Sequence, residues 1–395
     1  MKIKKTLFTV LTAISLVVTS SCASENQISF ENVTNNRSNG QNFYEGKYSY
    51  TDNCIYCAFE DGIYEYDISE KTALKIVDFA SISKELTWYD CSFAYIPDGI
   101  VIQGRGEEFD YDEKTGIVSQ SFNLYVVNFK GELKDTIVLK YQTNENDPSQ
   151  NEDHAIRGFY KFIIDNGWIY GSDRGSEMVR YDPLTEEVQY LGGGFISIAG
   201  DHIYFMDNYI IDDSDSSRTE DTISRVRESD LSNRETISFK GRISLDPKFG
   251  DEIMSRFSAY ADETLVCRKE IYSKGDEENN YDHWKGEKWY SFKFGEEPKV
   301  IGDGLAEYDD VFYAGGDYYA FSVFEAENLG EEVITDIDVI KVDGKSFERT
   351  AVFNGKLKGK GYPIMMGERF ILLNHSEDSA VIYNTETGEL INCTK

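Results

Sequence analysis

Histidine and cysteine are the residue types most suited to nucleophilic or metal chemistry, and in this chain neither forms a strong motif. The four histidines are spread along the sequence, at His154, His202, His283 and His375. No G-x-S-x-G elbow, H-E-x-x-H pair or phosphate-binding loop accompanies them. Cys54 and Cys57 form a C-x-x-C match, but in a strand-like run positions i and i+3 face opposite sides. We expect buried free thiols, because the remaining Cys91, Cys267 and Cys393 are too sparse for a disulfide framework.

Carboxylates are abundant: 71 Asp and Glu against 40 Lys and Arg give a formal net charge of −31. Such a surface repels phosphate backbones, so we expect no nucleic-acid partner. The acidic runs 107–113 and 212–221 are typical of solvated loop tips. Calcium ligation is the alternative for these runs, although neither has EF-hand spacing. No other cofactor is expected, and the sequence identifies no metal site.

The first 43 residues indicate export. Lys2, Lys4 and Lys5 precede an apolar stretch from Leu7 to Val18, which is too short to span a bilayer, so residues 1–21 are interpreted as a signal peptide. Thr19-Ser20-Ser21-Cys22 resembles a bacterial lipobox, which implies lipidation of Cys22. Thr19 departs from the usual leucine, so simple secretion is the alternative. Residues 22–43 are polar and read as a flexible tether. We expect an anchored lipoprotein on the outer face of the cytoplasmic membrane or on the cell surface.

Two kinds of turn alternate along the rest of the chain. The first kind lies between apolar runs at 52–53, 98–99, 166–167, 200–201, 262–263, 316–317 and 367–368. The second kind lies at 66–71, 128–133, 181–187, 227–233, 293–298, 341–346 and 383–389. Asn-Gly and Asp-Gly pairs favour tight hairpins because glycine accepts positive φ.

Seven strictly alternating pairs of turns predict seven units of four antiparallel strands. Such a repeat is typical of an all-β fold, the β-propeller, over residues 44–395. Six or eight blades, or a pair of β-sandwich domains, are the alternatives. The "D-G-I-Y" and "Y-D" patterns resemble diverged propellers of bacterial exported lipoproteins, and more distantly YWTD and quinoprotein-like propellers. The resemblance covers about 44–394 and implies an architecture rather than an activity.

Because strands alternate in direction, the two kinds of turn must share one face of the disc. The links between second and third strands, and those between blades, must share the other. We expect long links there at 104–116, 207–221, 273–288 and 325–336, and a long blade connection at 140–156. Long loops on a rigid scaffold commonly carry binding sites. Trp88, Tyr111 and Trp284 lie in or beside these segments and are our candidate ligand-binding residues, with packing of the loops as the alternative role.

The sequence favours a non-catalytic binding propeller, most simply a monomer, that recognises an envelope or extracellular protein or glycan. It contacts the membrane only through the lipid anchor. The alternative is a carbohydrate-active hydrolase or lyase. That alternative predicts two or more carboxylates on the innermost strands near the face with long links, one of them with a raised pKa. A third alternative is a propeller that only spaces or caps an assembly. It predicts that both faces of the disc are charged and carry no long links.

Overall fold

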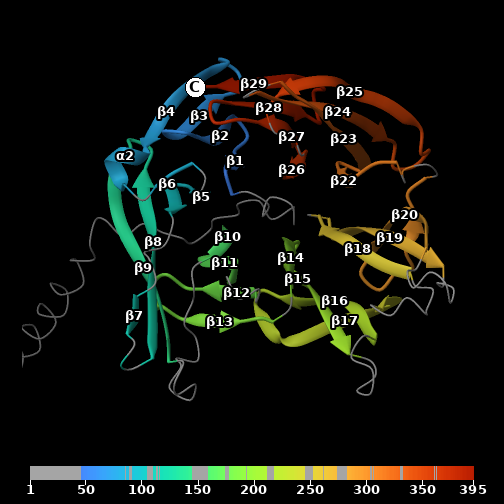
Figure 1. Cartoon of the computed structure of the whole chain (residues 1–395), viewed down its shortest axis with the longest axis horizontal. Helices are drawn as coiled ribbons and strands as arrows, with labels where there is room; N and C mark the ends of the chain where they lie inside the picture. Colours follow the sequence, from blue (N-terminus) through green and yellow to red (C-terminus); the bar gives the residue numbers. More distant parts are fainter. Residues whose placement is uncertain are drawn as a thin grey trace, which may run out of the picture.

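The computed structural model is built almost entirely of strands arranged in a ring (Figure 1). It describes the backbone of residues 46–84, 86–88, 91–104, 110–112, 114, 116–144, 159–173, 178–192, 194–210, 218–244, 252–260, 262–273, 283–302, 305, 307–329, 332–359, 361 and 363–395. The signal peptide (1–21), Cys22 and the tether (22–43) lie outside these residues. Within the described residues, no helix has the length and apolar character needed to cross a membrane.

The strands form seven antiparallel sheets, each from one continuous stretch of chain. Blade 1 contains β1 (Tyr48–Tyr50), β2 (Cys54–Phe59), β3 (Gly62–Asp67) and β4 (Thr72–Asp78), followed by the short helix α2 (Phe79–Ile82). Blade 2 contains β5 (Ser92–Ile96), β6 (Gly99–Gln103), β8 (Ile117–Asn128) and β9 (Leu133–Asn144), with β7 (Asp110–Asp112) paired to the extension of β8. Blade 3 contains β10 (Phe159–Asp165), β11 (Trp168–Asp173), β12 (Met178–Tyr181) and β13 (Val188–Tyr190).

The remaining blades follow the same order. Blade 4 contains β14 (Gly194–Ala199), β15 (His202–Ile210), β16 (Arg218–Arg227) and β17 (Asp230–Ser244). Blade 5 contains β18 (Glu252–Ala259), β19 (Thr264–Ser273), β20 (His283–Lys293) and β21 (Lys299–Val300). Blade 6 contains β22 (Asp310–Ala314), β23 (Asp317–Leu329), β24 (Glu332–Val342) and β25 (Arg349–Lys358). Blade 7 contains β26 (Ile364–Met366), β27 (Phe370–His375), β28 (Ser379–Asn384) and β29 (Leu390–Thr394). The predicted seven-bladed propeller is confirmed.

Both series of predicted turns fall where the repeat requires them, between the first and second strands and between the last two strands of each blade. At the turn that joins β10 to β11, Asn166 and Gly167 have φ of 45° and 84°. Positive φ at both positions is the requirement of a type I′ hairpin, which explains the Asn-Gly pair. The first strand of each blade lies nearest the centre of the ring (Figure 1). We call the face that carries these turns the turn face, and the opposite one the link face.

Seven buried apolar clusters hold the ring together, and each lies between two neighbouring blades. A strand alternates its side chains between two faces, so every blade contributes to two of these clusters. Cys54 and Cys57 show this alternation, since Cys54 packs toward blade 2 and Cys57 packs toward blade 7. The five cysteines in the described residues are free, and all but the half-buried Cys54 are buried, as expected.

Among the described strands, none is exchanged between blade 7 and blade 1 where the ring closes. Apolar residues of both blades, including Ile55, Phe59, Phe370 and Ile382, form one buried cluster there. We call this contact the seam. Since no covalent connection crosses it, the packing at the seam must hold the first and last blades together.

The links on the link face differ from the sequence expectation. The segments 207–221 and 325–336 were expected as loops, yet most of their residues continue the strand ladders as tall hairpins. The pairing runs to Ile210 with Thr219 in blade 4 and to Leu329 with Glu332 in blade 6. Lys356 and Lys358 lie in β25 opposite Asp336 and Ile334. Polar composition suggested loops because these extensions project beyond the packed core, where a strand needs no apolar face.

Candidate functional site

A group of charged side chains lies between blades 5 and 6 toward the link face. It consists of Arg256 on β18, Arg268 and Glu270 on β19, Glu287 on β20, and Asp309 and Asp310 at the start of β22. We call this group the blade 5–6 cluster. Both β18 and β22 are innermost strands, so the cluster adjoins the centre of the ring (Figure 1).

Strand alternation places these residues together. Val266 packs in the apolar core shared with blade 6, whereas its neighbour Cys267 packs toward blade 4. Arg268 and Glu270 follow Val266 at intervals of two, so both face blade 6. Across the hairpin, Arg268 pairs with Trp289 and Glu270 pairs with Glu287. The charged residues thus extend the apolar blade 5–6 core toward the link face.

Arg268 is the centre of the blade 5–6 cluster. Its Nη2 lies 2.5 Å from Glu270 Oε1, and its Nη1 lies 3.7 Å from Glu287 Oε2. The side chains of Arg268, Glu270 and Glu287 are 19%, 17% and 10% exposed, so water reaches them only partly. The Nε atom of Arg268 is buried and has no hydrogen-bond partner. Leaving a charged donor unpaired away from water is costly, so the arginine is held here against a desolvation penalty.

A second pair lies nearer the centre of the ring. Arg256 lies in a bulge of β18 and has a φ of 56°. Its Nη1 lies 3.9 Å from Oδ2 of Asp310, whose side chain is only 3% exposed. The backbone N–H of Val311 donates to the other carboxylate oxygen at 2.9 Å. Asp310 is therefore a buried carboxylate with fixed partners.

Glu287 is a carboxylate of the blade 5–6 cluster whose proton affinity departs from ordinary behaviour. Burial raises the pKa of Glu287, and the negative charges of Glu270 and Asp309 raise it further, while the nearby arginines oppose the shift. A carboxyl group in this setting holds its proton to a higher pH than an exposed glutamate. This is the environment of a group that can donate a proton or a hydrogen bond.

Apolar and aromatic surfaces adjoin the charges. Trp289 and Tyr260 are buried beneath them in the blade 5–6 core. On blade 6, Ala320 packs into the same core. Ser322 and Phe324 follow Ala320 at intervals of two along β23, on the same side of the strand. Phe324 is 61% exposed, so the extended hairpin presents an aromatic ring to solvent on the side toward blade 5.

The three aromatic residues singled out from the sequence lie in different blades or connections and are not gathered at one place. Trp88 lies between blades 1 and 2 beside the seam. Tyr111 lies in β7 opposite Val118, and Trp284 lies in β20 opposite Tyr272. The side chains of Tyr111 and Trp284 lie outside the described part of the structure. Trp284 belongs to the same hairpin as the blade 5–6 cluster. Ligand binding by the three stays a prediction.

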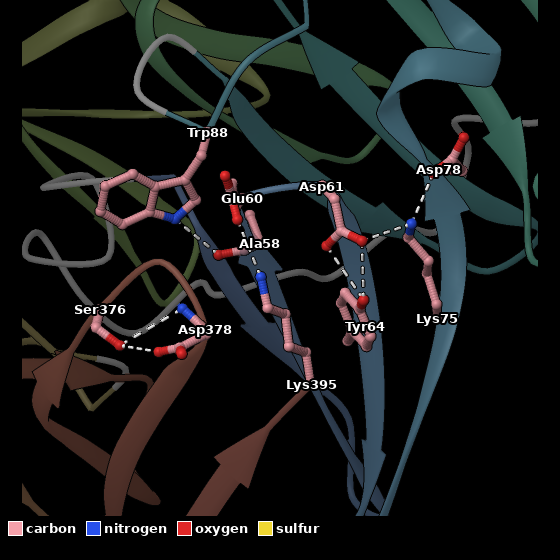
Figure 2. Close-up of polar contacts among 10 residues, drawn as sticks. All are labelled: Ala58, Glu60, Asp61, Tyr64, Lys75, Asp78, Trp88, Ser376, Asp378 and Lys395. Atoms are coloured by element: carbon pink, nitrogen blue, oxygen red, sulfur yellow. Dashed lines mark hydrogen bonds and ion pairs between the residues drawn. The ribbon is translucent and has the colours of Figure 1, made fainter.

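Trp88 is half-buried, and several contacts hold its side chain in place. Its indole Nε1 donates to the backbone carbonyl of Ala58 at 3.0 Å (Figure 2). The Nζ of Lys47 lies 3.9 Å from its ring centroid, and the ring of His375 meets it edge-on at 6.0 Å. These contacts fix the loop after α2 against blades 1 and 7.

The charged groups around Trp88 form close pairs. Lys75 Nζ lies 2.8 Å from Asp61 and 2.6 Å from Asp78, and Lys395 lies 3.1 Å from Glu60 across the seam (Figure 2). Burial alone would raise the pKa of Asp61, but hydrogen bonds from Lys75 and Tyr64 outweigh it and lower that pKa below its ordinary value. These five charges each have an opposite charge beside them.

One group of metal-ligating side chains occurs among the described residues. It consists of Asp201, His202 and Glu263, on the turn face between blades 4 and 5. It contains no residue of the acidic runs in which the sequence suggested calcium. Much of the runs 107–113 and 212–221 lies outside the described residues, so the calcium hypothesis stays a prediction.

Comparisons with known proteins give only distant similarities. No protein-family model matches the chain, and a search of curated proteins finds no match. Among solved structures, an oligogalacturonate lyase from Vibrio parahaemolyticus is similar at 10% identity and a TM-score of 0.41, over 78% of this chain and 85% of that one. BamB from Moraxella catarrhalis is similar at 8% identity and 0.36, over 89% and 88%. The β-propeller domain of the Trilobed protease from Pyrococcus furiosus is similar at 12% and 0.35, over 86% and 88%. Similarities at this level carry no argument about activity.

Proposed function

We propose that the protein is a cell-envelope-anchored, non-catalytic binding propeller whose ligand contacts the link face. In this proposal, residues 1–21 direct export, Cys22 carries the lipid, and residues 22–43 hold the propeller away from the membrane. The blade 5–6 cluster and Phe324 form the contact surface. The tall hairpins of blades 4, 5 and 6 project on the same face and would flank a bound ligand.

The observation that carries the proposal is the position of Arg268. A partly buried arginine, two neighbouring carboxylates and an exposed aromatic ring on the same side of the next blade suit a ligand rich in hydroxyl groups. Sugar rings offer hydroxyls for charged hydrogen bonds and an apolar face for a phenyl ring. We therefore favour an oligosaccharide as ligand, with an extracellular protein as the other candidate.

Thermal melting with a panel of soluble oligosaccharides and peptidoglycan fragments tests the proposal. A ligand at about a hundredfold its Kd stabilises a fold by about 2.7 kcal/mol, which is a shift of several degrees for a domain of this size. We expect such a shift for the parent protein and its loss in Glu270→Gln. The matched control is Glu296→Gln, an exposed glutamate in the turn before β21. No shift with any glycan would contradict oligosaccharide binding and leave a protein partner.

A hydrolase or lyase is the second candidate, favoured by the raised pKa of Glu287. Asp310 on an innermost strand is the second carboxylate that such an activity would use, while Glu287 lies on a third strand rather than on an innermost one. Analysis of products in the same glycan mixtures separates the two candidates. New reducing ends or unsaturated sugars that disappear in Glu287→Gln would establish catalysis, whereas unchanged glycans support a binding module.

A further inference from the structure

We propose that Asp201, His202 and Glu263 form a binding site for a divalent transition-metal ion on the turn face, between blades 4 and 5. The site is distinct from the blade 5–6 cluster and does not depend on the proposed function. One ligand atom from each residue lies within 4.8 Å of the others. A histidine nitrogen with two carboxylate oxygens is a donor set that suits Zn²⁺ or Mn²⁺.

The hydrogen bond of His202 does not account for the position of the Asp201 carboxylate. Its Nδ1 lies 2.6 Å from Glu263 Oε1 and 2.9 Å from Asp201 Oδ1, and only the contact with Glu263 has hydrogen-bond geometry. A ring nitrogen carries at most one proton, so it cannot donate fully to both oxygens. A cation between the three atoms would satisfy the nitrogen lone pair and both negative oxygens together.

The two turns hold these ligands in place. Asp201 and His202 follow Gly200 in the turn from β14 to β15, and Glu263 immediately precedes β19. The carboxylate of Glu263 lies against Gly200, where a Cβ atom would stand 3.0 Å from Oε1. His202 is 7% exposed, whereas the side chain of Asp201 is 68% exposed. The turn geometry thus brings a buried nitrogen and an accessible oxygen to one point that metal ions can reach.

Arg225 is a supporting residue for this site. Its Nη1 lies 3.6 Å from Glu263 Oε2, while its Nε lies 2.7 Å from Glu235. The guanidinium therefore contacts the oxygen of Glu263 that faces away from His202, and Glu235 offsets its charge. Outer contacts of this kind commonly orient the carboxylates that ligate metals.

Isothermal titration of the purified protein with ZnCl₂, after treatment with EDTA, tests the site. We expect one equivalent of Zn²⁺ to bind. Co²⁺ should give visible absorption bands typical of a site with nitrogen and oxygen ligands.

Asp201→Asn is the decisive variant, because this side chain is 68% exposed and lies outside the buried cluster between blades 4 and 5. It should weaken Zn²⁺ binding by about tenfold or more. Glu263→Gln should do the same, and Asp98→Asn, at the corresponding exposed turn of blade 2, should bind like the parent. Absence of stoichiometric binding by a folded parent protein, or equal binding by all three variants, would overturn the proposal. His202 would then be a histidine held between two blades by hydrogen bonds.

Discussion

The seam and the blade 5–6 interface are the same kind of contact, yet the polar groups above their cores are arranged differently. At the seam, an apolar core that includes Phe370 is covered by pairs such as Lys395 with Glu60. At the blade 5–6 interface, the apolar core gives way to a cluster in which Arg268 and Glu287 are both largely buried. The first arrangement leaves its charges accessible to water, so it costs little in desolvation. The second has a cost in desolvation that packing alone does not explain, which points to ligand contact.

The largest expected difference between the two regions concerns stability. Phe370 is fully buried at the seam and meets Tyr50 edge-on at 5.2 Å. Phe370→Ala should lower the free energy of unfolding by about 3–5 kcal/mol, since it removes a buried ring and leaves a cavity. Phe324→Ala, at an exposed ring above the blade 5–6 interface, should change it by about 0.5 kcal/mol or less. Urea denaturation measures both, and equal losses would contradict the distinction.

The pH dependence of stability should have opposite signs in the two regions. Burial raises the pKa of Glu287, so its ionised form is disfavoured in the folded protein. Below the ordinary glutamate pKa, Glu287 does not lower the free energy of unfolding. The loss grows as the pH rises above that value and through the pKa of Glu287 in the folded protein. The free energy of unfolding of Glu287→Gln should therefore rise relative to that of the parent as the pH increases. A difference that does not vary between pH 4 and pH 8 would count against a raised pKa.

Asp61→Asn should show the opposite dependence on pH and the smallest change in the free energy of unfolding. Its pKa is lowered, so its ionised form stabilises the folded protein above the ordinary aspartate pKa, and this gain is lost as the pH falls through the folded value. Asp61→Asn should cost about 0.2–1 kcal/mol at neutral pH, because the pair with Lys75 is largely solvent-exposed. The cost should vanish in acid. Urea curves at pH 7 and pH 3 check this, and an equal cost at both values would contradict it.

The sequence predicted the ring far better than the site. The turn at Asn166-Gly167 could be recognised because positive φ restricts which residues can stand there, and Gly200, Gly316 and Gly367 have positive φ at three of its counterparts. The link face could be derived from strand direction alone. The tall hairpins were mistaken for loops, because Phe324 and its neighbours project beyond the core and carry no apolar alternation.

The blade 5–6 cluster was missed for a different reason. Arg268 and Glu270 lie at the inward positions that follow Val266, a signal that strand alternation could have given. Nothing in the sequence, however, indicates that Arg268 and Glu270 of blade 5 lie at the same level as Asp309 and Asp310 of the next blade. That contact depends on how two sheets pack, and it decides which of 71 acidic residues share one environment.

The most direct test of the account compares glycan binding by two variants that each remove an exposed apolar side chain. Phe324 is 61% exposed on the link face beside the blade 5–6 cluster, and Leu74 is 64% exposed on the outermost strand of blade 1. Each variant is melted with and without the glycan that stabilises the parent protein most. The account predicts that Leu74→Ala keeps the parent's shift in Tm and that Phe324→Ala loses most of it. An undiminished shift in Phe324→Ala, or a loss confined to Leu74→Ala, would contradict the assignment of ligand binding to this part of the link face.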